Sequence, residues 1–184
     1  PTEQQQISNY LDHKTQQIDS LIEKTQQKIE LLKEQRISLI NQVVTKGLNP
    51  DVEMKDSGVE WIGEIPSGWV VSKLKYDTLT PVKYGMNISG DKYVDEGIRF
   101  IRITDLTDWG ELIKDNGKYL LKDDVTEEFL LRKYDLLLCR SGHTVGKSYL
   151  HLEDGYYTSG GYLVRFNFGN YSNSKYIFYI TKTD

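Results

Sequence analysis

The sequence is poor in the residues that build disulfides and zinc sites. Among its 184 residues are one cysteine, Cys139, and three histidines. A single cysteine cannot form an internal disulfide, and Cys139 ends an apolar run, where a small buried thiol is typical. Structural zinc sites use four ligands, mainly Cys and His. These shortages exclude a disulfide-based scaffold, argue against a structural zinc site and favour a reducing compartment.

Long hydrophobic runs are also missing. The apolar runs are short, as at residues 136–139, whereas a membrane-spanning helix needs about 20 predominantly apolar residues. No basic segment followed by an apolar one resembles a secretory signal. We therefore expect a cytoplasmic protein that does not bind a membrane.

The sequence lacks an excess of positive charge. It contains 23 Lys and Arg against 27 Asp and Glu, a net charge of −4, while domains that bind DNA are usually basic. A chain with this balance would bind DNA only through a local basic patch, helped by a basic partner.

The common catalytic motifs are absent too. There is no Asn/Asp-Pro-Pro-Tyr/Phe segment of adenine methyltransferases, no acidic metal cluster and no glycine-rich cofactor motif. Cys139 could pair with His143 or His151, but reactive cysteines lie in exposed, electropositive surroundings, and Cys139 ends a strand that looks buried. We expect no catalytic residue, no metal ligand and no cofactor bound by this chain.

Composition changes sharply near residue 47. Glycine is absent before this point, and all 15 glycines, three tryptophans and five phenylalanines come from it onwards. This change predicts an α+β protein in which a long N-terminal helix of the coiled-coil type, at 1–47, precedes a strand-rich mixed domain at 70–184. Between them, residues 48–69 contain two tryptophans and two prolines, which indicates an ordered linker pinned on a surface.

Apolar residues in the first segment recur with the heptad spacing of a coiled coil. They predict a helix from about residue 3 to 46, about 65 Å long, that ends at Gly47 and Pro50. Two interpretations stay open: the helix serves simple oligomerisation, or it is a rigid spacer that sets the distance between two recognition units. The side chains expected to contact another helix or a partner are Ile7, Leu11, Ile18, Ile22, Ile29, Leu32, Arg36, Leu39 and Val43.

The second segment has short runs rich in Val, Ile, Tyr and Thr between Gly and Asp turns, a pattern typical of strands. Strands are expected near 70–76, 98–103, 135–140, 145–151 and 161–168, and helices near 123–133 and 173–181.

Residues 140–148 resemble a nucleotide-binding P-loop but depart from it. Gly142 stands too close to Gly146, and Ser141 occupies the position of the first glycine. The alternating residues that follow predict a strand rather than the helix that a P-loop opens. What remains is a strand–loop–strand hairpin, either an unliganded polar turn or a loop that contacts phosphates and base edges. Its candidate contacts are Arg140, Ser141, His143, Thr144 and Lys147.

Two other polar segments are weaker candidates. The loop at 83–93 offers Lys83, Tyr84 and Asn87, and it equally suits an ordinary surface loop. Arg102, near a strand end, could contact DNA or pair with Asp105. A further aromatic and hydroxyl-rich loop occupies residues 156–162.

Segments distributed over nearly the whole sequence carry a resemblance to a known family. Pro-Thr-Glu-Gln-Gln-Gln-Ile at 1–7, Leu-Leu-Lys-Glu-Gln-Arg at 31–36 and Val-Thr-Lys-Gly-Leu at 44–48 resemble the spacer helix of Type I restriction-modification specificity subunits. Lys-Asp-Ser-Gly-Val-Glu-Trp-Ile-Gly-Glu-Ile-Pro at 55–66 resembles the start of their target recognition domain. Segments similar to the body of that domain are 99–106, 135–138 and 140–147.

The resemblance implies a function in DNA recognition. A whole subunit of this family has two recognition domains and two antiparallel spacer helices, and each domain reads half of a split site on double-stranded DNA. Methyltransferase subunits that use S-adenosylmethionine bind to it, and a restriction subunit adds translocation and cleavage with ATP and magnesium.

This sequence departs from the family pattern because it has one helix and one recognition domain and begins at Pro1. It is either a piece of a larger subunit or a half-size subunit that forms a homodimer through residues 3–46. The rival interpretation from another class is a non-enzymatic coiled-coil adaptor whose globular half binds protein or another polymer.

Overall fold

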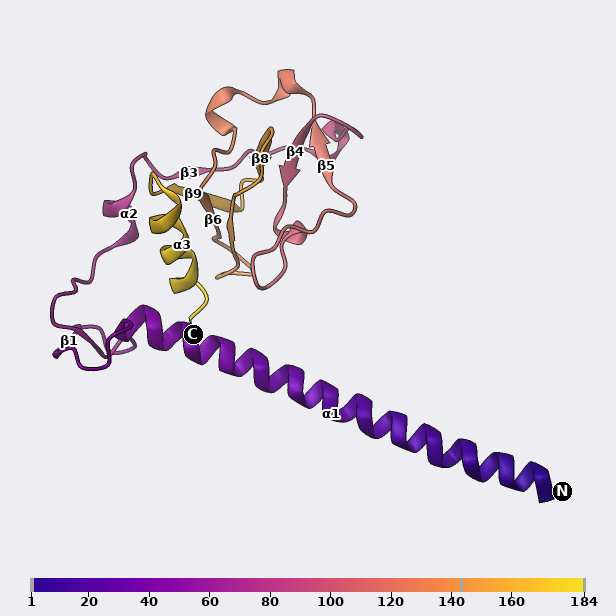
Figure 1. Ribbon diagram of the computed structural model, residues 1–184. Coiled ribbons are helices and arrows are strands. Elements are labelled where there is room, and N and C mark those ends of the chain that lie inside the picture. The colour runs from indigo at the N-terminus through magenta and orange to yellow at the C-terminus, as the bar shows by residue number, and fades with distance from the viewer. Residues whose placement is uncertain (1, 143, 184) are drawn as a thin grey trace.

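The computed structural model describes residues 2–142 and 144–183 and has the predicted α+β composition. Helix α1 (Thr2–Lys46) projects as a rod from a strand-rich domain that sits over its C-terminal end (Figure 1). Gly47 ends the helix with a φ of +77°, and its N–H donates to the Val43 carbonyl at 3.0 Å. Glycine adopts this left-handed conformation without strain, so the predicted helix end is confirmed.

The apolar residues of α1 predicted to contact another helix form a seam along it, and the Ile and Leu residues of this seam lie open to solvent. No residue of the helix is buried. The Ile and Leu side chains of the seam, from Ile7 to Leu39, are 42–62% exposed. A helix with so many exposed apolar side chains needs a partner to cover them, and the coiled-coil pairing stays a prediction. None of the described helices is long and apolar enough to cross a membrane.

A small hairpin joins α1 to the domain. Strands β1 (Met54–Asp56) and β2 (Glu64–Pro66) pair antiparallel, and β2 contacts α1. Trp69 then packs edge-on against Tyr176, with 6.5 Å between ring centroids, and the Tyr176 hydroxyl donates to the Val44 carbonyl at 3.2 Å. The linker is therefore ordered and fixed to both the helix and the domain.

Two sheets form the domain. The first has the order β3-β9-β6-β7 and is antiparallel throughout; the second has the order β5-β4-β8, with β4 and β8 parallel. Helix α3 packs on β6 and β7 and contacts α1 (Figure 1). The bounds are β3 (Lys83–Tyr84), β4 (Ile98–Ile101), β5 (Lys118–Leu120), β6 (Asp135–Cys139), β7 (Ser148–Leu150), β8 (Tyr157–Ser159), β9 (Leu163–Asn167) and α3 (Tyr171–Ile180).

The core lies where the two sheets meet. Ile101, Leu137 and Leu163 are fully buried in one cluster, and Leu120 is fully buried in a second. Burial of each such side chain stabilises the fold by about 1.5–3 kcal/mol. Strands predicted near 98–103, 135–140, 145–151 and 161–168 are confirmed with shorter limits, and the helix predicted near 173–181 is confirmed at Tyr171–Ile180.

Two predicted elements were wrong. Residues 70–76 form no strand: Val70 and Val71 are 85% and 42% exposed without a paired neighbour, and the short helix α2 (Leu74–Asp77) follows. Residues 123–133 form no α-helix, but two 3-10 turns, η3 (Lys122–Asp124) and η4 (Glu127–Phe129). The chain there lies against β8, since the Leu131 N–H donates to the Tyr157 carbonyl at 2.8 Å. Tertiary pairing has replaced the local helical preference.

Candidate functional site

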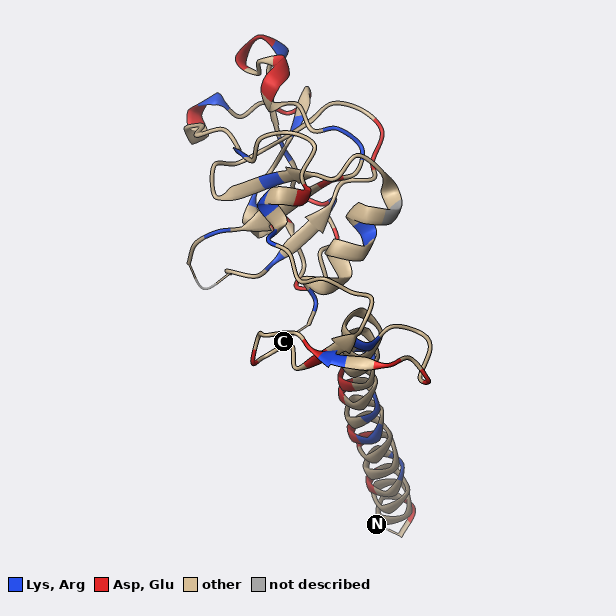
Figure 2. Ribbon diagram, turned by 90° about the vertical axis from the view of Figure 1, so that its left-hand side faces the viewer, with Lys and Arg blue, Asp and Glu red and all other residues tan. Residues whose placement is uncertain are grey.

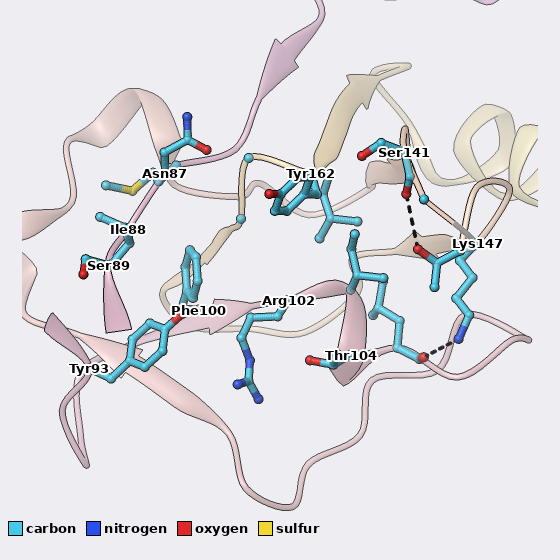
Figure 3. Close-up of a pocket in the computed structure, with 18 residues that line it drawn as sticks. Asn87, Ile88, Ser89, Tyr93, Phe100, Arg102, Thr104, Ser141, Lys147 and Tyr162 are labelled. Carbon is cyan, nitrogen blue, oxygen red and sulfur yellow. Dashed lines mark hydrogen bonds between the residues drawn. The ribbon is translucent and has the colours of Figure 1, made fainter. Parts of the chain in front are cut away.

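A hollow of about 1020 Å³ opens where four separate segments of the domain meet (Figure 3). They are the loop after β3, the end of β4 with the 3-10 turn η2 (Ile103–Asp105), the β6–β7 loop and the segment before β9. Ligand sites in proteins are typically hollows of about 300–1000 Å³. The hollow is lined by Met86, Asn87, Ile88, Ser89, Tyr93, Phe100, Arg102, Ile103, Thr104, Leu106, Ser141, Gly142, Thr144, Lys147, Gly160, Gly161, Tyr162 and Leu163.

The β6–β7 hairpin positions one wall of the hollow. Leu136 pairs with Leu150 and Leu138 with Ser148 across the ladder, which confirms the predicted strand–loop–strand. Gly142 and Gly146 have φ of +79° and +94°, and this left-handed backbone brings the tight loop back to β7. A strand rather than a helix follows the loop, so it does not have the structure of a P-loop.

Arg140 and Tyr84 do not line the hollow but form an exposed pair in segments that lead into it. The Arg140 guanidinium lies 4.6 Å from the centre of the Tyr84 ring. Both residues are exposed, because Tyr84 lies in the edge strand β3 and Arg140 directly follows β6. Stacking on an aromatic ring orients a guanidinium while leaving its N–H groups free for a ligand. Lys83, by contrast, pairs with Glu128 at 3.1 Å.

Arg102 is held by a buried carboxylate. Its Nη2 donates to Asp105 Oδ1 at 2.6 Å and its Nε to Oδ2 at 3.2 Å, so the predicted pairing with Asp105 is confirmed. The buried Arg99 donates from Nη1 to the same Oδ2 at 3.1 Å. Burial alone would raise the pKa of Asp105, but hydrogen bonds from Arg102 and the two arginine charges hold it below its usual value.

Lys147 is the second cation of the hollow. Its Nζ lies 2.8 Å from Asp108 Oδ1 and donates to the Leu106 carbonyl at 3.3 Å. The hydrogen bond and charge of Lys147 lower the pKa of Asp108. Among the described residues that line the hollow, both cations, Arg102 and Lys147, therefore have a carboxylate beside them, which reduces the positive charge of the site.

The structure brings together most of the predicted contact residues. Asn87, Arg102, Ser141, Thr144 and Lys147 line the hollow, Tyr84 and Arg140 flank each other, and Lys83 is engaged elsewhere. His143 lies outside the described residues. The predicted contact residues did not include Tyr93, Phe100 and Thr104. Phe100 lies in β4, Tyr93 follows a 3-10 turn at Gly90–Lys92 and Thr104 lies in η2, and their residue types alone did not distinguish them. Tyr162 lay in the aromatic segment 156–162 and could have been chosen.

The thiol and imidazole considered as a catalytic pair have other partners. Cys139 is buried, and its Sγ lies 3.0 Å from Thr144 Oγ1. His151 is also buried, with Nδ1 3.3 Å from the Tyr149 hydroxyl and its ring 4.9 Å from that of Tyr157. Both groups thus belong to the packed interior. Within residues 2–142 and 144–183, no group of three or more His, Cys, Asp or Glu is placed to hold a metal.

The buried His151 makes stability depend on pH. Burial lowers its pKa from 6.5 to about 4, so the unfolded chain binds a proton more readily than the folded one. The contribution of the neutral, buried His151 to the free energy of unfolding is fully present above pH 6.5. It falls as the pH decreases towards 4, with a slope approaching about 1.4 kcal/mol per pH unit. Urea unfolding at pH 7.5 and 5.5 measures the loss, and a His151→Gln variant should show a smaller one; equal losses would contradict this assignment.

No protein-family model matches the sequence, and no curated protein matches it.

Proposed function

We propose that this chain is the DNA sequence-specificity module of a Type I restriction-modification enzyme. It reads one half of a bipartite site on double-stranded DNA and has no catalytic role of its own. One observation carries the proposal. Five residues predicted from the sequence to contact DNA come from segments far apart in the chain and line one hollow. The sequence blocks that resemble such subunits support the same assignment.

The chemistry of the hollow suits base edges and phosphates. An arginine stacked on an aromatic ring, such as Arg140 on Tyr84, can donate two hydrogen bonds to guanine, and an amide such as Asn87 can pair with adenine. Hydroxyl groups of Ser141 and Thr144 can bond to a phosphate or a base. Arg102 is held in place by Asp105, so little conformational entropy is lost when it binds.

Helix α1 supplies the surface for assembly. Its exposed apolar side chains would be covered by a second spacer helix, from another copy or from the rest of a larger subunit, and by the methyltransferase subunits. The restriction subunit would join this assembly. S-adenosylmethionine, ATP and magnesium would be used by those partners.

Methylation mapping tests the proposal. The chain is combined with the methyltransferase subunit of the same source, and methylated adenines are mapped on plasmid DNA. A symmetric split motif indicates two paired copies that each read a half-site. A stable complex without a motif indicates a partial subunit, and the absence of both complex and motif would contradict the proposal.

The β6–β7 loop should contribute directly to affinity. Arg140→Ala and Lys147→Ala are each expected to weaken binding to duplex DNA by about 1–3 kcal/mol, with the melting temperature little changed. Fluorescence anisotropy with a labelled duplex measures this. Lys133→Ala is the control, because Lys133 pairs with Asp154 outside the hollow. Unchanged affinity in both loop variants would remove this loop from the site.

The acidity of the chain favours one alternative, an adaptor that binds protein or another polymer. Its net charge is −4, and Asp105 and Asp108 accompany the cations of the hollow. A salt titration separates the two functions. Affinity for DNA falls steeply as salt rises because bound counterions are released, and an adaptor would show no measurable affinity for DNA to titrate.

A further inference from the structure

Three cationic side chains converge where the domain meets α1. Arg36 comes from α1, Lys147 from the β6–β7 loop and Lys182 from the segment after α3. All three meet the turn that contains Asp108 and Trp109. The Arg36 guanidinium lies 3.9 Å from the centre of the Trp109 ring, and Lys147 Nζ lies 2.8 Å from Asp108 Oδ1.

Lys182 is half-buried. Its Nζ donates to the carbonyls of Asp108 at 3.2 Å and of Ser148 at 3.4 Å, and it lies 4.8 Å from the centre of the Phe178 ring. Its pKa is lowered to about 8, mainly by burial and also by the positive charges of Arg36 and Lys147, against the opposing effect of Asp108. The cluster therefore has more positive charge than its own carboxylate balances.

Asp108 is placed as a replaceable counter-ion. Its side chain is 88% exposed, so it can turn away into solvent at little cost when another anion approaches. The acidic residues of η3 and η4 lie at the end of the domain away from α1 (Figure 2). Within the cluster itself, three cationic side chains meet one carboxylate, that of Asp108, although the net charge of the chain is −4.

We propose that Arg36, Lys147 and Lys182 bind a backbone phosphate of DNA, which displaces the Asp108 carboxylate from Lys147. This inference rests on the proposed function and names where the DNA backbone is held. Lys147 also lines the hollow, so a strand bound over the hollow continues across the cluster towards α1. The helix would then contribute Arg36 to DNA binding in addition to its role in assembly.

Removing the negative charge of Asp108 and removing the positive charge of Lys182 should change the affinity for DNA in opposite directions. Affinity for a labelled duplex is measured by fluorescence anisotropy at several salt concentrations. Asp108→Asn is expected to tighten binding about three- to tenfold, because the phosphate no longer competes with a carboxylate. Lys182→Gln is expected to weaken binding and to reduce the slope of log K against log salt by about 0.9, the loss of one phosphate contact.

Asp154→Asn is the matched control. Asp154 is 90% exposed and pairs with Lys133 at 3.1 Å, so this variant changes the net charge equally and is expected to leave affinity within about twofold. Equal gains from Asp108→Asn and Asp154→Asn would overturn the phosphate site and leave only an effect of net charge. Because Asp108 is exposed, this comparison holds even if Lys182→Gln does not fold.

Two other outcomes separate this inference from the proposed function. If the unmodified chain does not bind duplex DNA, alone or with the methyltransferase subunit, the proposed function fails. If it binds but the Asp108 and Lys182 variants behave like the control, only the phosphate site fails. A change in affinity for the methyltransferase subunit, with DNA affinity unchanged, would also overturn the site and assign the cluster to a protein contact.

Discussion

Ile22→Asp combined with Leu32→Asp is expected to abolish pairing of α1 with another helix. Both side chains belong to the predicted seam and are exposed in the single chain, by 62% and 53%. A seam residue buried by a partner contributes about 1.5–3 kcal/mol, and an aspartate in its place adds the cost of an unpaired buried charge. Two such changes predict a loss of at least about 100-fold in association.

Sedimentation equilibrium and co-purification with the methyltransferase subunit measure this loss. Ser20→Asp with Gln27→Asp is the matched control, because these positions lie on the opposite face of the helix and receive the same charge. The control should associate like the unmodified chain. Equal association in both double variants would show that the apolar seam is not a pairing surface, and equal loss would indicate a general effect of charge or of helix stability.

Asp105→Ala is expected to destabilise the domain by about 3–5 kcal/mol, because it leaves two arginines without their shared carboxylate. Asp105 is 4% exposed and accepts hydrogen bonds from the buried Arg99 and the half-buried Arg102. Arg99 also connects β4 to β5 through the carbonyl of Lys118 and to the loop before β5 through the carbonyl of Ile113. The loss therefore loosens the turn that forms one wall of the hollow.

Urea unfolding followed by circular dichroism measures this effect. The control is Asp124→Ala, which breaks the more exposed pair with Lys92, 2.8 Å long, and should change stability little. A small change for Asp105→Ala would mean that water or another group solvates the arginines. An intact fold with weakened DNA binding would instead place Asp105 among the residues that position Arg102 for its ligand.

The successful predictions from sequence all depend on local patterns. The long helix α1 and its end at Gly47 require only neighbours within a few turns of one helix, whereas pairing through the heptad pattern stays a prediction. The β6–β7 hairpin follows from an apolar run, two glycines and an alternating run that are contiguous in the chain. The pair of Arg102 and Asp105 spans three residues, close enough to be suggested by sequence alone.

The failed predictions concern segments whose conformation is set by distant partners. Residues 70–76 carry valines typical of a strand, but a strand needs a neighbour to satisfy its N–H and C=O groups, and no sheet edge reaches them. Residues 123–133 have a helical composition, but the hydrogen bond from Thr158 Oγ1 to the Phe129 carbonyl at 2.9 Å helps to hold this stretch against β8. A single sequence does not reveal such competition.

Local patterns in the sequence account for the long helix, its line of apolar side chains, the hairpin loop and the polar residues available to build a site. Which of these residues meet depends on the tertiary structure. It placed Asn87, Arg102, Ser141, Thr144 and Lys147 around one hollow and directed Lys83 to Glu128 instead. It also brought Arg36 and Lys182 to the same turn as Lys147. The physical reason is that helix periodicity and turn chemistry act between near neighbours, whereas the register of strands and the packing of two sheets bring together residues that are far apart in the chain.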